Sequence, residues 1–582
     1  MPTLAPAALP RSRGGFLLRA ATLLALFALT ASLLPGQTPV PQSRRIAIFG
    51  SSVASGTGDD TGREGYAGKW RELLAPRGWE VLNQSRGGDS TLTAAPRFAP
   101  VGEPQPNTKY LLPVNPAYVV IGLSLGNEGI KNQSDTAGRD RISTQFETGL
   151  LGFIQRSREN RILPIIANCY TRQDFTDVEY AYVKRMNLLI NSWDVPSINF
   201  LGAVDDGTGK WAKGFIHDAL HPNLSGHAEM ALTFVPSLFE ALEKGKARPA
   251  RPTATELAGI NGNTTLTFVP SEKMHPFALG VSVRAQADGN IATLSGSTLT
   301  AETYYLVATG AAGARGGSPV TLSAAQLAAI NTLEARMPDA SQAVTNARAA
   351  LTRAVLTNAP AINQEAANVA AADLALALAR ADAFAAVQSG AHRFSTAQLA
   401  PIVTAAGRGA SLQTFGRGAG AGGGVVEETA MNPAGNFTAG ISVRNNVWTY
   451  TSSNGTTIAS AVRADGNWHN LVLSHYTARG ETLFYVDGQL AGRTAERLEP
   501  KSFHLGGVTG AATFSLRDVL LYRSALNADE VSALQAGTLL QSSLEIYAPL
   551  IDTIVAAGAP VENRAQSLSA FIAGSDGAPV IR

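Results

Sequence analysis

Four polar clusters in the first half of the chain bring together the residue types of nucleophilic catalysis. A serine hydroxyl attacks a carbonyl only when a base takes its proton, and a histidine base needs a third group to orient it. The clusters are Phe49–Gly56, Asn83–Ser90, Gly122–Glu128 and Asp218–Asn223. The Gly-Ser-Ser sequence of the first cluster is also common in turns, so by itself it gives weak support for a catalytic serine.

Short apolar runs alternate with amphipathic segments over residues 45–242, a pattern typical of a parallel sheet covered by helices. The predicted strands are continuously apolar, as strands covered on both faces should be. They are Arg45–Phe49, Trp79–Asn83, Tyr118–Leu123, Ile162–Asn168 and Ser197–Leu201, and the predicted helices are Tyr66–Leu74, Ser143–Arg158, Val178–Trp193 and His227–Leu242. Three clusters follow strands, where open α/β sheets place their binding groups, and the fourth precedes the last helix.

The four clusters, in this order, resemble the four sequence blocks of the SGNH (GDSL-type) hydrolases, which are serine esterases with a flavodoxin-like α/β/α fold. The resemblance covers roughly residues 45–242, and its most specific parts are the Asp-x-x-His-Pro-Asn block and the block around Asn127, which stands for the family's Gly-x-Asn. Two positions depart from the common pattern. Ser51 stands where the family has the aspartate of Gly-Asp-Ser, and Glu128 stands where Gly-x-Asn-Asp has its aspartate. Neither is a proton-transfer or oxyanion group that the resemblance implies.

Carried over residue by residue, the resemblance implies a catalytic triad and an oxyanion hole. Ser52 would be the nucleophile, His221 the general base and Asp218 the residue that orients the imidazole. The oxyanion hole would consist of the backbone N–H groups of Ser52 and Gly88 with the side-chain amide of Asn127. Attack on an ester creates an oxyanion, so donors placed in advance accelerate the reaction.

Other residues compete for these roles. Cys169 follows the fourth predicted strand, but a free cysteine is more often a small buried hydrophobe than a nucleophile. His217 lacks the Asp-x-x-His spacing, and Asp89 would either line the substrate cleft or cap a turn. The segment Gly416–Gly424 has no following Lys-Ser/Thr, which favours a flexible loop over a phosphate site. A single cysteine excludes an intrachain disulfide and a cysteine-cluster metal site.

The N-terminal residues 1–40 indicate an export signal or membrane anchor, because three arginines precede an uncharged run, Ala20–Leu34. This run has the length of a signal-peptide core and is short of the ~20 residues that span a bilayer. No small-x-small cleavage site is obvious after it, so an uncleaved anchor stays open as the one membrane contact. We expect a secreted protein or one of the bacterial cell envelope or periplasm.

The basic, proline-containing segment 243–254 is the best linker in the chain. After it, residues 255–550 resemble a laminin-G-like, concanavalin-type jelly roll with an alanine-rich helical insertion at about 320–390. The strands at Thr264–Leu294 would open this all-β sandwich, because neither piece alone has enough strands. Residues 551–582 would be a C-terminal extension.

The resemblance to the jelly roll rests on Asp465–Leu473, Leu483–Leu490 and Leu516–Leu534, and Asp487-Gly488 predicts a tight hairpin turn. Such domains often bind glycans, sometimes with calcium, so the resemblance implies polysaccharide binding. A scaffold that packs on the esterase and shapes its cleft is the competing interpretation, in which Trp468 and Tyr485 are packing residues. Nothing in the sequence supports a calcium site, and we expect no cofactor and no metal.

Length and charge limit the function further. A chain of 582 residues predicts two or three folding units, and 47 basic against 45 acidic residues lacks the charge excess of a nucleic-acid-binding protein. The resemblance to the SGNH hydrolases, the attached jelly roll and the N-terminal segment together imply an exported serine esterase that removes short acyl groups, preferably acetyl, from carbohydrate. The alternatives are a lipase or thioesterase with the same triad, and a non-catalytic glycan-binding surface protein.

Overall fold

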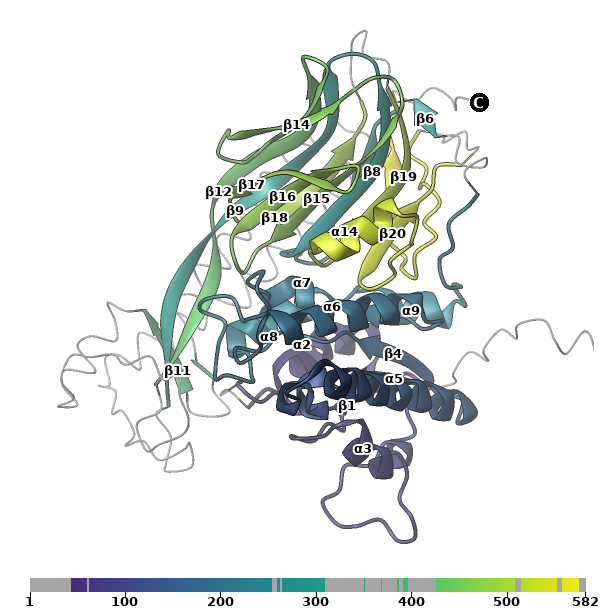
Figure 1. The fold of residues 1–582 in the computed structure, drawn as a ribbon, viewed down its shortest axis with the longest axis vertical. Coiled ribbons are helices and arrows are strands. Elements are labelled where there is room, and N and C mark those ends of the chain that lie inside the picture. The colour runs from purple at the N-terminus through teal and green to yellow at the C-terminus, as the bar shows by residue number, and fades with distance from the viewer. Residues whose placement is uncertain are drawn as a thin grey trace, which may run out of the picture. The chain divides into compact units, whose positions relative to one another are not determined.

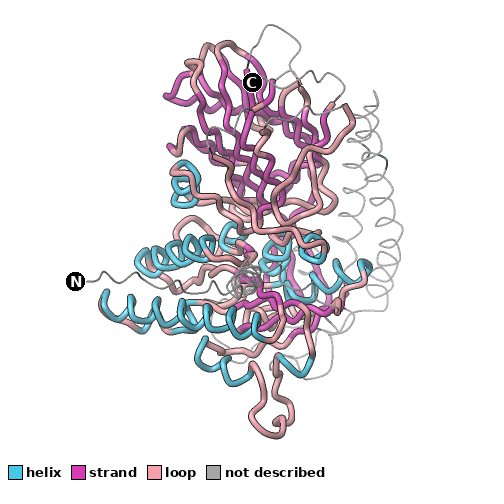
Figure 2. Tube along the Cα trace, turned by 90° about the vertical axis from the view of Figure 1, so that its right-hand side faces the viewer, coloured by secondary structure: helices cyan, strands magenta, loops and turns pink. Residues whose placement is uncertain are grey.

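The computed structural model contains an α/β region followed by a β region, which Figure 1 colours from purple through teal and green to yellow along the chain. Figure 2 shows the long helices in the first region and most of the strands in the second. The structure describes residues 43–59, 62–253, 259–261, 264–308, 350, 368, 385–386, 391–395, 425–507, 514–551 and 557–574.

The α/β region is built on a five-stranded parallel sheet with the strand order β2-β1-β3-β4-β5. Its strands are β1 (Arg45–Gly50), β2 (Glu80–Asn83), β3 (Tyr118–Gly122), β4 (Leu163–Ala167) and β5 (Ser197–Ile198). The central strands are apolar on both faces because helices cover both. Ile46 and Ile48 pack into one apolar cluster, and Ala47 and Phe49 pack into the other. The predicted α/β/α fold is confirmed.

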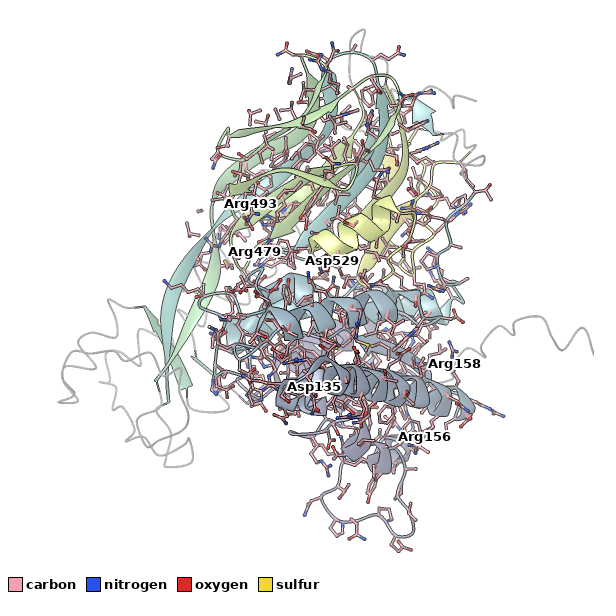
Figure 3. All side chains as sticks on the ribbon, viewed as in Figure 1. Asp135, Arg156, Arg158, Arg479, Arg493 and Asp529 are labelled. Atoms are coloured by element: carbon pink, nitrogen blue, oxygen red, sulfur yellow. The ribbon has the colours of Figure 1, made fainter. Side chains whose placement is uncertain are left out.

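The helices around this sheet are α2 (Gly65–Leu74), α3 (Thr91–Ala94), α4 (Leu125–Glu128), α5 (Thr136–Glu159), α6 (Asp177–Ser192), α7 (Leu201–Val204), α8 (Leu224–Leu232) and α9 (Leu238–Glu243), with 3₁₀ turns η1 (Ala75–Arg77), η2 (Ala95–Arg97), η3 (Leu112–Val114) and η4 (Ile130–Asn132). The longest of them, α5, carries charges that suit its dipole. Asp135 accepts a hydrogen bond from the N–H of Gly138 at its start, and Arg156 and Arg158 lie in its last turn, as Figure 3 shows.

Two predicted elements are shorter than expected. The predicted strand Ser197–Leu201 is ordered as a strand only over Ser197–Ile198, because Leu201 already begins α7. The predicted helix His227–Leu242 is two helices, α8 and α9. Pro236 lies between them, and its ring and missing N–H do not allow the first helix to continue.

In the described residues of the β region, two antiparallel sheets enclose one apolar core. Their main paths are β14-β13-β12-β9-β18-β7-β21 and β17-β16-β15-β8-β19-β20. The bounds are β6 (Ile260–Asn261), β7 (Leu266–Phe268), β8 (Phe277–Ala285), β9 (Gly289–Ala308), β10 (Ala385–Ala386), β11 (Ala391–Ser395), β12 (Val425–Arg444), β13 (Val447–Thr451), β14 (Thr457–Arg463), β15 (Trp468–Tyr476), β16 (Glu481–Val486), β17 (Gln489–Ala495), β18 (Leu498–Leu505), β19 (Phe514–Tyr522), β20 (Leu544–Ala548), β21 (Ile572–Ala573) and the helix α14 (Ala528–Gln535).

The early strands of this sandwich pair with the late ones, as predicted. β8 lies between β15 and β19, and β9 lies between β12 and β18. The predicted hairpin turn is also confirmed, with φ of 51° at Asp487 and 77° at Gly488 between β16 and β17. The laminin-G type of the sandwich stays a prediction.

The two regions share an interface of buried polar groups. The N–H of Ser543 donates to the carbonyl of Ser197 in the edge strand β5 at 3.0 Å, and the hydroxyls of Ser197 and Ser542 lie 2.6 Å apart. Asp529 of α14, labelled in Figure 3, forms an ion pair with Lys184 of α6 at 2.8 Å. Residues 41–582 accordingly form one compact unit.

Several predicted segments lie outside the described residues, namely 1–40, almost all of the helical insertion at 320–390 and the glycine-rich segment 416–424. Within the predicted C-terminal extension, β21 pairs with β7 in the first sheet of the sandwich. The boundaries 45–242, 243–254, 255–550 and 551–582 stay predictions. Across the ranges that the structure describes, no helix is both long and apolar enough to cross a membrane.

Candidate active site

Ser52 lies in the turn that follows β1, where the ends of β1 and β3 approach each other closely. A side chain at Gly50 would meet the carbonyl oxygen of Gly122 at 2.2 Å, so this position needs glycine. The N–H of Ser51 donates to that same carbonyl at 3.1 Å and fixes the turn. Ser51 is fully buried, whereas Ser52 is partly exposed. The strand end therefore presents the hydroxyl of Ser52 at the surface of the sheet edge.

The structure brings Ser52, His221 and Asp218 together. The Nε2 atom of His221 lies 2.8 Å from the Oγ atom of Ser52. On the other side of the ring, Nδ1 lies 2.8 and 2.9 Å from the two carboxylate oxygens of Asp218. This is the geometry that a serine nucleophile, its base and the orienting group require.

A tight turn holds Asp218 and His221 on the same side. The Oδ1 atom of Asp218 accepts hydrogen bonds from the N–H groups of Leu220 and His221, at 2.8 and 2.9 Å. Burial works to raise the pKa of Asp218, but the hydrogen bonds from His221 and Leu220 outweigh it and lower the pKa to about 2. The carboxylate is therefore ionised at any physiological pH and can stabilise an imidazolium.

The helix α8 anchors this turn to the loop after Ser52. Asn223 caps α8 by accepting a hydrogen bond from the N–H of Gly226, and its amide donates to the carbonyl of Gly214. The Nε2 atom of His227 lies 3.0 Å from the carbonyl of Thr57. Burial lowers the pKa of His227 to about 4, so this histidine is neutral and joins the two loops as a structural group.

The expected oxyanion donors lie on two adjacent loops. A Cβ built at Gly87 would be 3.8 Å from the Cβ of Ser52, so the loop that carries Gly88 lies beside the nucleophile. The Nδ2 atom of Asn127 donates to the carbonyl of Asp89 at 3.1 Å, which leaves its second N–H for another acceptor. Among the described residues, the N–H groups of Ser52 and Gly88 donate to no other group.

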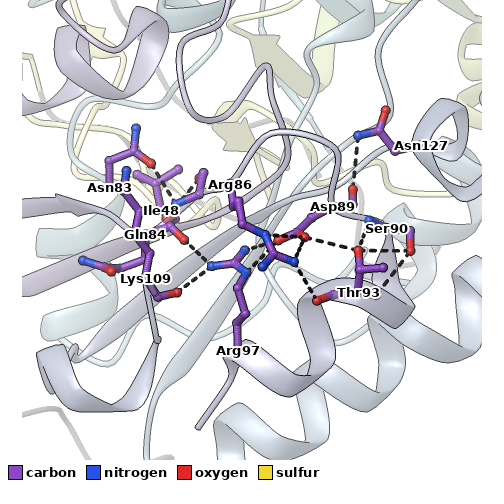
Figure 4. A network of polar contacts seen from close by, with 11 residues as sticks. Ile48, Asn83, Gln84, Arg86, Asp89, Ser90, Thr93, Arg97, Lys109 and Asn127 are labelled. Carbon is purple, nitrogen blue, oxygen red and sulfur yellow. Dashed lines mark hydrogen bonds and ion pairs between the residues drawn. The ribbon is translucent and has the colours of Figure 1, made fainter. Parts of the chain in front are cut away.

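The carboxylate of Asp89 does not face the cleft, and it accepts hydrogen bonds from side chains and not from the N–H groups of a turn. It is buried and paired with Arg97 and Arg86, as Figure 4 shows. Ser90 is the residue that caps α3. Sequence reasoning missed Arg97, because nothing in the spacing of residues linked it to the block around Gly88.

The two departures from the family pattern are both buried. Glu128 accepts hydrogen bonds from the N–H and hydroxyl of Thr91 and from the amide of Gln145, at 2.6 to 2.8 Å. It thereby ties the turn of Asn127 to α3 and α5.

Burial raises the pKa of Cys169 to about 12, so this thiol stays protonated and does not compete with Ser52.

His221, and not His217, faces Ser52. Within the described ranges, no group of three or more metal-ligating side chains could hold an ion. The expected absence of a metal stays a prediction.

A sequence model of the GDSL-like Lipase/Acylhydrolase family matches residues 48–229. Among solved structures, the chain is similar to a G-D-S-L family lipolytic protein from Desulfitobacterium hafniense, at 15% identity over 32% of this chain and 96% of that chain, with a TM-score of 0.26. It is also similar to a GDSL-like lipase from Bacteroides thetaiotaomicron, at 14% identity over 36% and 94% of the two chains, with a TM-score of 0.25.

A further similar structure is a catalytic mutant of an acetylxylan esterase from Geobacillus stearothermophilus, at 13% identity over 32% of this chain and 90% of that chain, with a TM-score of 0.26. Structural similarity of this extent carries no argument about the reaction. No curated protein matches the chain. The family match spans all four clusters of the site, and residues 48–229 are therefore a domain of the GDSL-like lipase/acylhydrolase family, which makes this chain an ester-bond hydrolase.

Proposed function

We propose that this protein hydrolyses acyl esters with Ser52 as nucleophile, His221 as general base and Asp218 as the orienting carboxylate. The observation that carries the proposal is the pair of contacts on one imidazole ring, 2.8 Å from Nε2 to the Ser52 hydroxyl and 2.8 Å from Nδ1 to Asp218. With the Nδ1 proton donated to Asp218, the lone pair of Nε2 faces Ser52 and can accept its proton.

The first half of the reaction forms an acyl-enzyme. The Oγ atom of Ser52 attacks the ester carbonyl carbon while its proton passes to Nε2 of His221. The carbonyl oxygen becomes an oxyanion, which the N–H groups of Ser52 and Gly88 and the amide of Asn127 would stabilise. The carbon–oxygen bond to the alcohol then breaks, and the alcohol leaves with the proton from His221.

The second half restores the enzyme. Water attacks the acyl carbon of the ester on Ser52, and its proton passes to Nε2 of His221. The bond between Oγ and the acyl carbon breaks, the carboxylic acid leaves, and Ser52 regains its proton from His221. The ionised Asp218 stabilises the imidazolium in both halves.

We further propose that the substrate carries short acyl groups, preferably acetyl, on a carbohydrate, and that the protein is exported. The uncharged run in residues 1–40 and the attached sandwich support this choice. The fraction of chains that lack the N-terminal segment, measured by N-terminal sequencing of protein from the envelope and the medium, tests export. Retention of the segment in membranes would favour the uncleaved anchor.

The contacts of Trp468 and Tyr485 favour a packing role for these two residues over contact with a glycan. The guanidinium groups of Arg284 and Arg517 lie over the ring of Trp468, 5.2 and 4.1 Å from its centroid, and Tyr485 is buried. The buried ring of Tyr485 offers no face to a sugar, and a sugar would compete with two guanidinium groups for the ring of Trp468. Met431 of β12, in contrast, packs against Ala212 and Phe215 of the segment that leads to His221.

The test is a chain-length series of p-nitrophenyl esters from acetate to dodecanoate, with acetate release from acetylated xylan and pectin measured beside it. The full chain should lose activity beyond short acyl groups, and Ser52→Ala should remove it without changing the circular dichroism spectrum. A preference for long chains would favour the lipase or thioesterase alternative. Wild-type activity in Ser52→Ala would overturn the triad, and absent labelling by a fluorophosphonate would favour a non-catalytic protein.

A further inference from the structure

We infer that the buried ion pair of Asp89 and Arg97 is a positioning device for the oxyanion hole, so that Arg97 acts on the reaction without touching the substrate. This inference rests on the proposed ester hydrolysis. It concerns the loop between β2 and α3, which carries Gly88 and lies beside Ser52.

Arg97 is held by Asp89, by two main-chain carbonyls and by the ring of a residue in the sheet. Its side chain is 3% exposed and that of Asp89 is 1% exposed. Its Nε atom donates to Oδ2 of Asp89 at 2.8 Å, and Nη2 donates to the same oxygen. Its Nη1 atom donates to the carbonyls of Gln84 and Lys109, at 2.8 and 2.6 Å, and its guanidinium lies 4.6 Å from the ring centroid of Phe49 in β1.

Asp89 transmits this fixed position to the two loops of the oxyanion hole (Figure 4). Its second carboxylate oxygen accepts from Nε and Nη2 of Arg86, at 3.0 and 2.6 Å, and from the hydroxyl of Thr93 at 3.2 Å. Its main-chain carbonyl accepts from the amide of Asn127 at 3.1 Å. Asp89 therefore makes three connections. Its side chain binds Arg97, its main-chain carbonyl binds Asn127, and its peptide bond joins it to Gly88.

This linkage predicts an effect on the transition state more than on substrate binding. Donors of an oxyanion hole act where charge develops, so a small displacement of Gly88 or Asn127 lowers kcat and leaves KM nearly unchanged. A purely structural ion pair would instead lower the amount of folded protein while the folded fraction kept its kcat.

The experiment is a double-mutant cycle with Asp89→Asn and Asn127→Ala, measured on p-nitrophenyl acetate with the full chain. Asn127→Ala should lower kcat by ~10²–10³. Asp89→Asn should lower it by about tenfold or more with KM changed less than about twofold, and the double variant should lose less than the product of the two single losses. Losses that multiply, or an unchanged kcat in Asp89→Asn, would overturn the inference.

The matched control is Glu545→Gln in the sandwich, which breaks a second buried pair, Arg523 and Glu545, with a distance of 2.7 Å and side chains 1% and 0% exposed. Its Tm should fall as in Asp89→Asn while its kcat stays unchanged. If Asp89→Asn does not fold, Arg86→Ala removes a half-exposed partner of the same carboxylate and must show the same non-additivity with Asn127→Ala. A wild-type chain no more active than Ser52→Ala would refute the proposed function. Failure of the inference alone would instead leave the wild type active and the kcat of Asp89→Asn unchanged.

Discussion

Two histidines of this protein, His221 and His469, both contact an aspartate through Nδ1 and differ in the group that faces Nε2. His221 contacts Asp218 through Nδ1 and the hydroxyl of Ser52 through Nε2, both at 2.8 Å. His469 contacts Asp487 through Nδ1 at 2.7 Å and Asp465 through Nε2 at 3.0 Å. Their side chains are 13% and 11% exposed, so burial does not distinguish them.

The second partner decides what each ring can do. The hydroxyl of Ser52 faces Nε2 of His221 and can transfer its proton to the ring. A second carboxylate faces Nε2 of His469, so this ring can only form an ion pair. Burial works to lower the pKa of His469, but the hydrogen bonds and charges of Asp465 and Asp487 outweigh it and raise the pKa. An Asp–His pair alone therefore does not identify a catalytic histidine in this protein. The group that faces the other ring nitrogen distinguishes His221 from His469.

The largest expected effect is at the histidine that faces the hydroxyl. His221→Ala should lower kcat/KM for p-nitrophenyl acetate by about 10⁵–10⁶, because the serine loses its base. Labelling of Ser52 by a fluorophosphonate, followed with time, should slow in parallel. A loss of less than tenfold would mean that another group serves as the base.

The next effect concerns the orienting carboxylate. Asp218→Asn should lower kcat by ~10⁴, because the amide no longer holds the tautomer that presents the lone pair of Nε2. Since the pKa of Asp218 is lowered to about 2, the carboxylate of the wild type is ionised across the assay range. Asp218 itself therefore adds no titration between pH 6 and pH 8, and kcat of wild type and variant, measured at pH 8, checks the prediction.

A third histidine extends the comparison to a fully buried site between the two regions. His275 lies 2.8 Å from Glu229 of α8 and 3.3 Å from Glu499 of β18. Burial works to lower its pKa, but the two glutamates outweigh it and raise the pKa to about 9. A raised pKa in the folded state stabilises below the unfolded value of about 6.5, and this contribution is lost as the pH rises through about 9.

His275→Gln should therefore lower the free energy of unfolding at pH 6 by about 3 kcal/mol, because the buried Glu229 loses its charged partner, whereas Glu499 keeps Lys273 and Lys501. Thermal unfolding measured from pH 6 to pH 10 should show the difference in Tm between wild type and variant shrinking as the pH rises. A difference that grows with pH would contradict the direction of the pKa shift.

The smallest effect is expected at His469. His469→Gln should leave kcat unchanged and alter the free energy of unfolding by less than about 1 kcal/mol, since Asp465 is half exposed. The loss should be present at pH 5.5 and smaller at pH 8, because a raised pKa stabilises only while the ring is protonated. A drop in kcat would show that the sandwich acts on the ester site through this hairpin.

The sequence predicts the residues at the ends of parallel strands well, because those ends meet at one edge of the sheet. Ser52 and Asn127 follow β1 and β3, and Asp218 and His221 are three residues apart in one turn, so short spacings suffice to assign them. The splitting of the last helix at Pro236 and the short β5 were not predicted. The short β5 lies at the interface with the β region, where long-range contacts override the local pattern. The split of the last helix has a local cause, Pro236, which is visible in the sequence.

Arg97 illustrates why other site residues escape sequence reasoning. The tripeptide Ala-Pro-Arg occurs at η1 (Ala75–Arg77) and again at η2 (Ala95–Arg97). Arg77 is 27% exposed and pairs with Glu272, whereas Arg97 is 3% exposed and lies under the oxyanion loop. The same tripeptide thus contributes a partly exposed ion pair at Arg77 and a buried one at Arg97. The surrounding fold, and not the local sequence, determines which of the two arginines is buried.

The hydrogen bonds between β5 and the segment at Ser542 and Ser543 also have a consequence for biosynthesis. Ser197 and Ser542 are 345 residues apart, so a ribosome that adds about 5–20 residues per second needs roughly 17–70 s to complete the pair. During that time the edge of the parallel sheet has no partner, and an open edge is a template for pairing with other chains. In a nascent chain the edge at β5 therefore stays unpaired until Ser542 and Ser543 have been synthesised, and a message truncated before Ser542 yields a sheet in which this edge is permanently open.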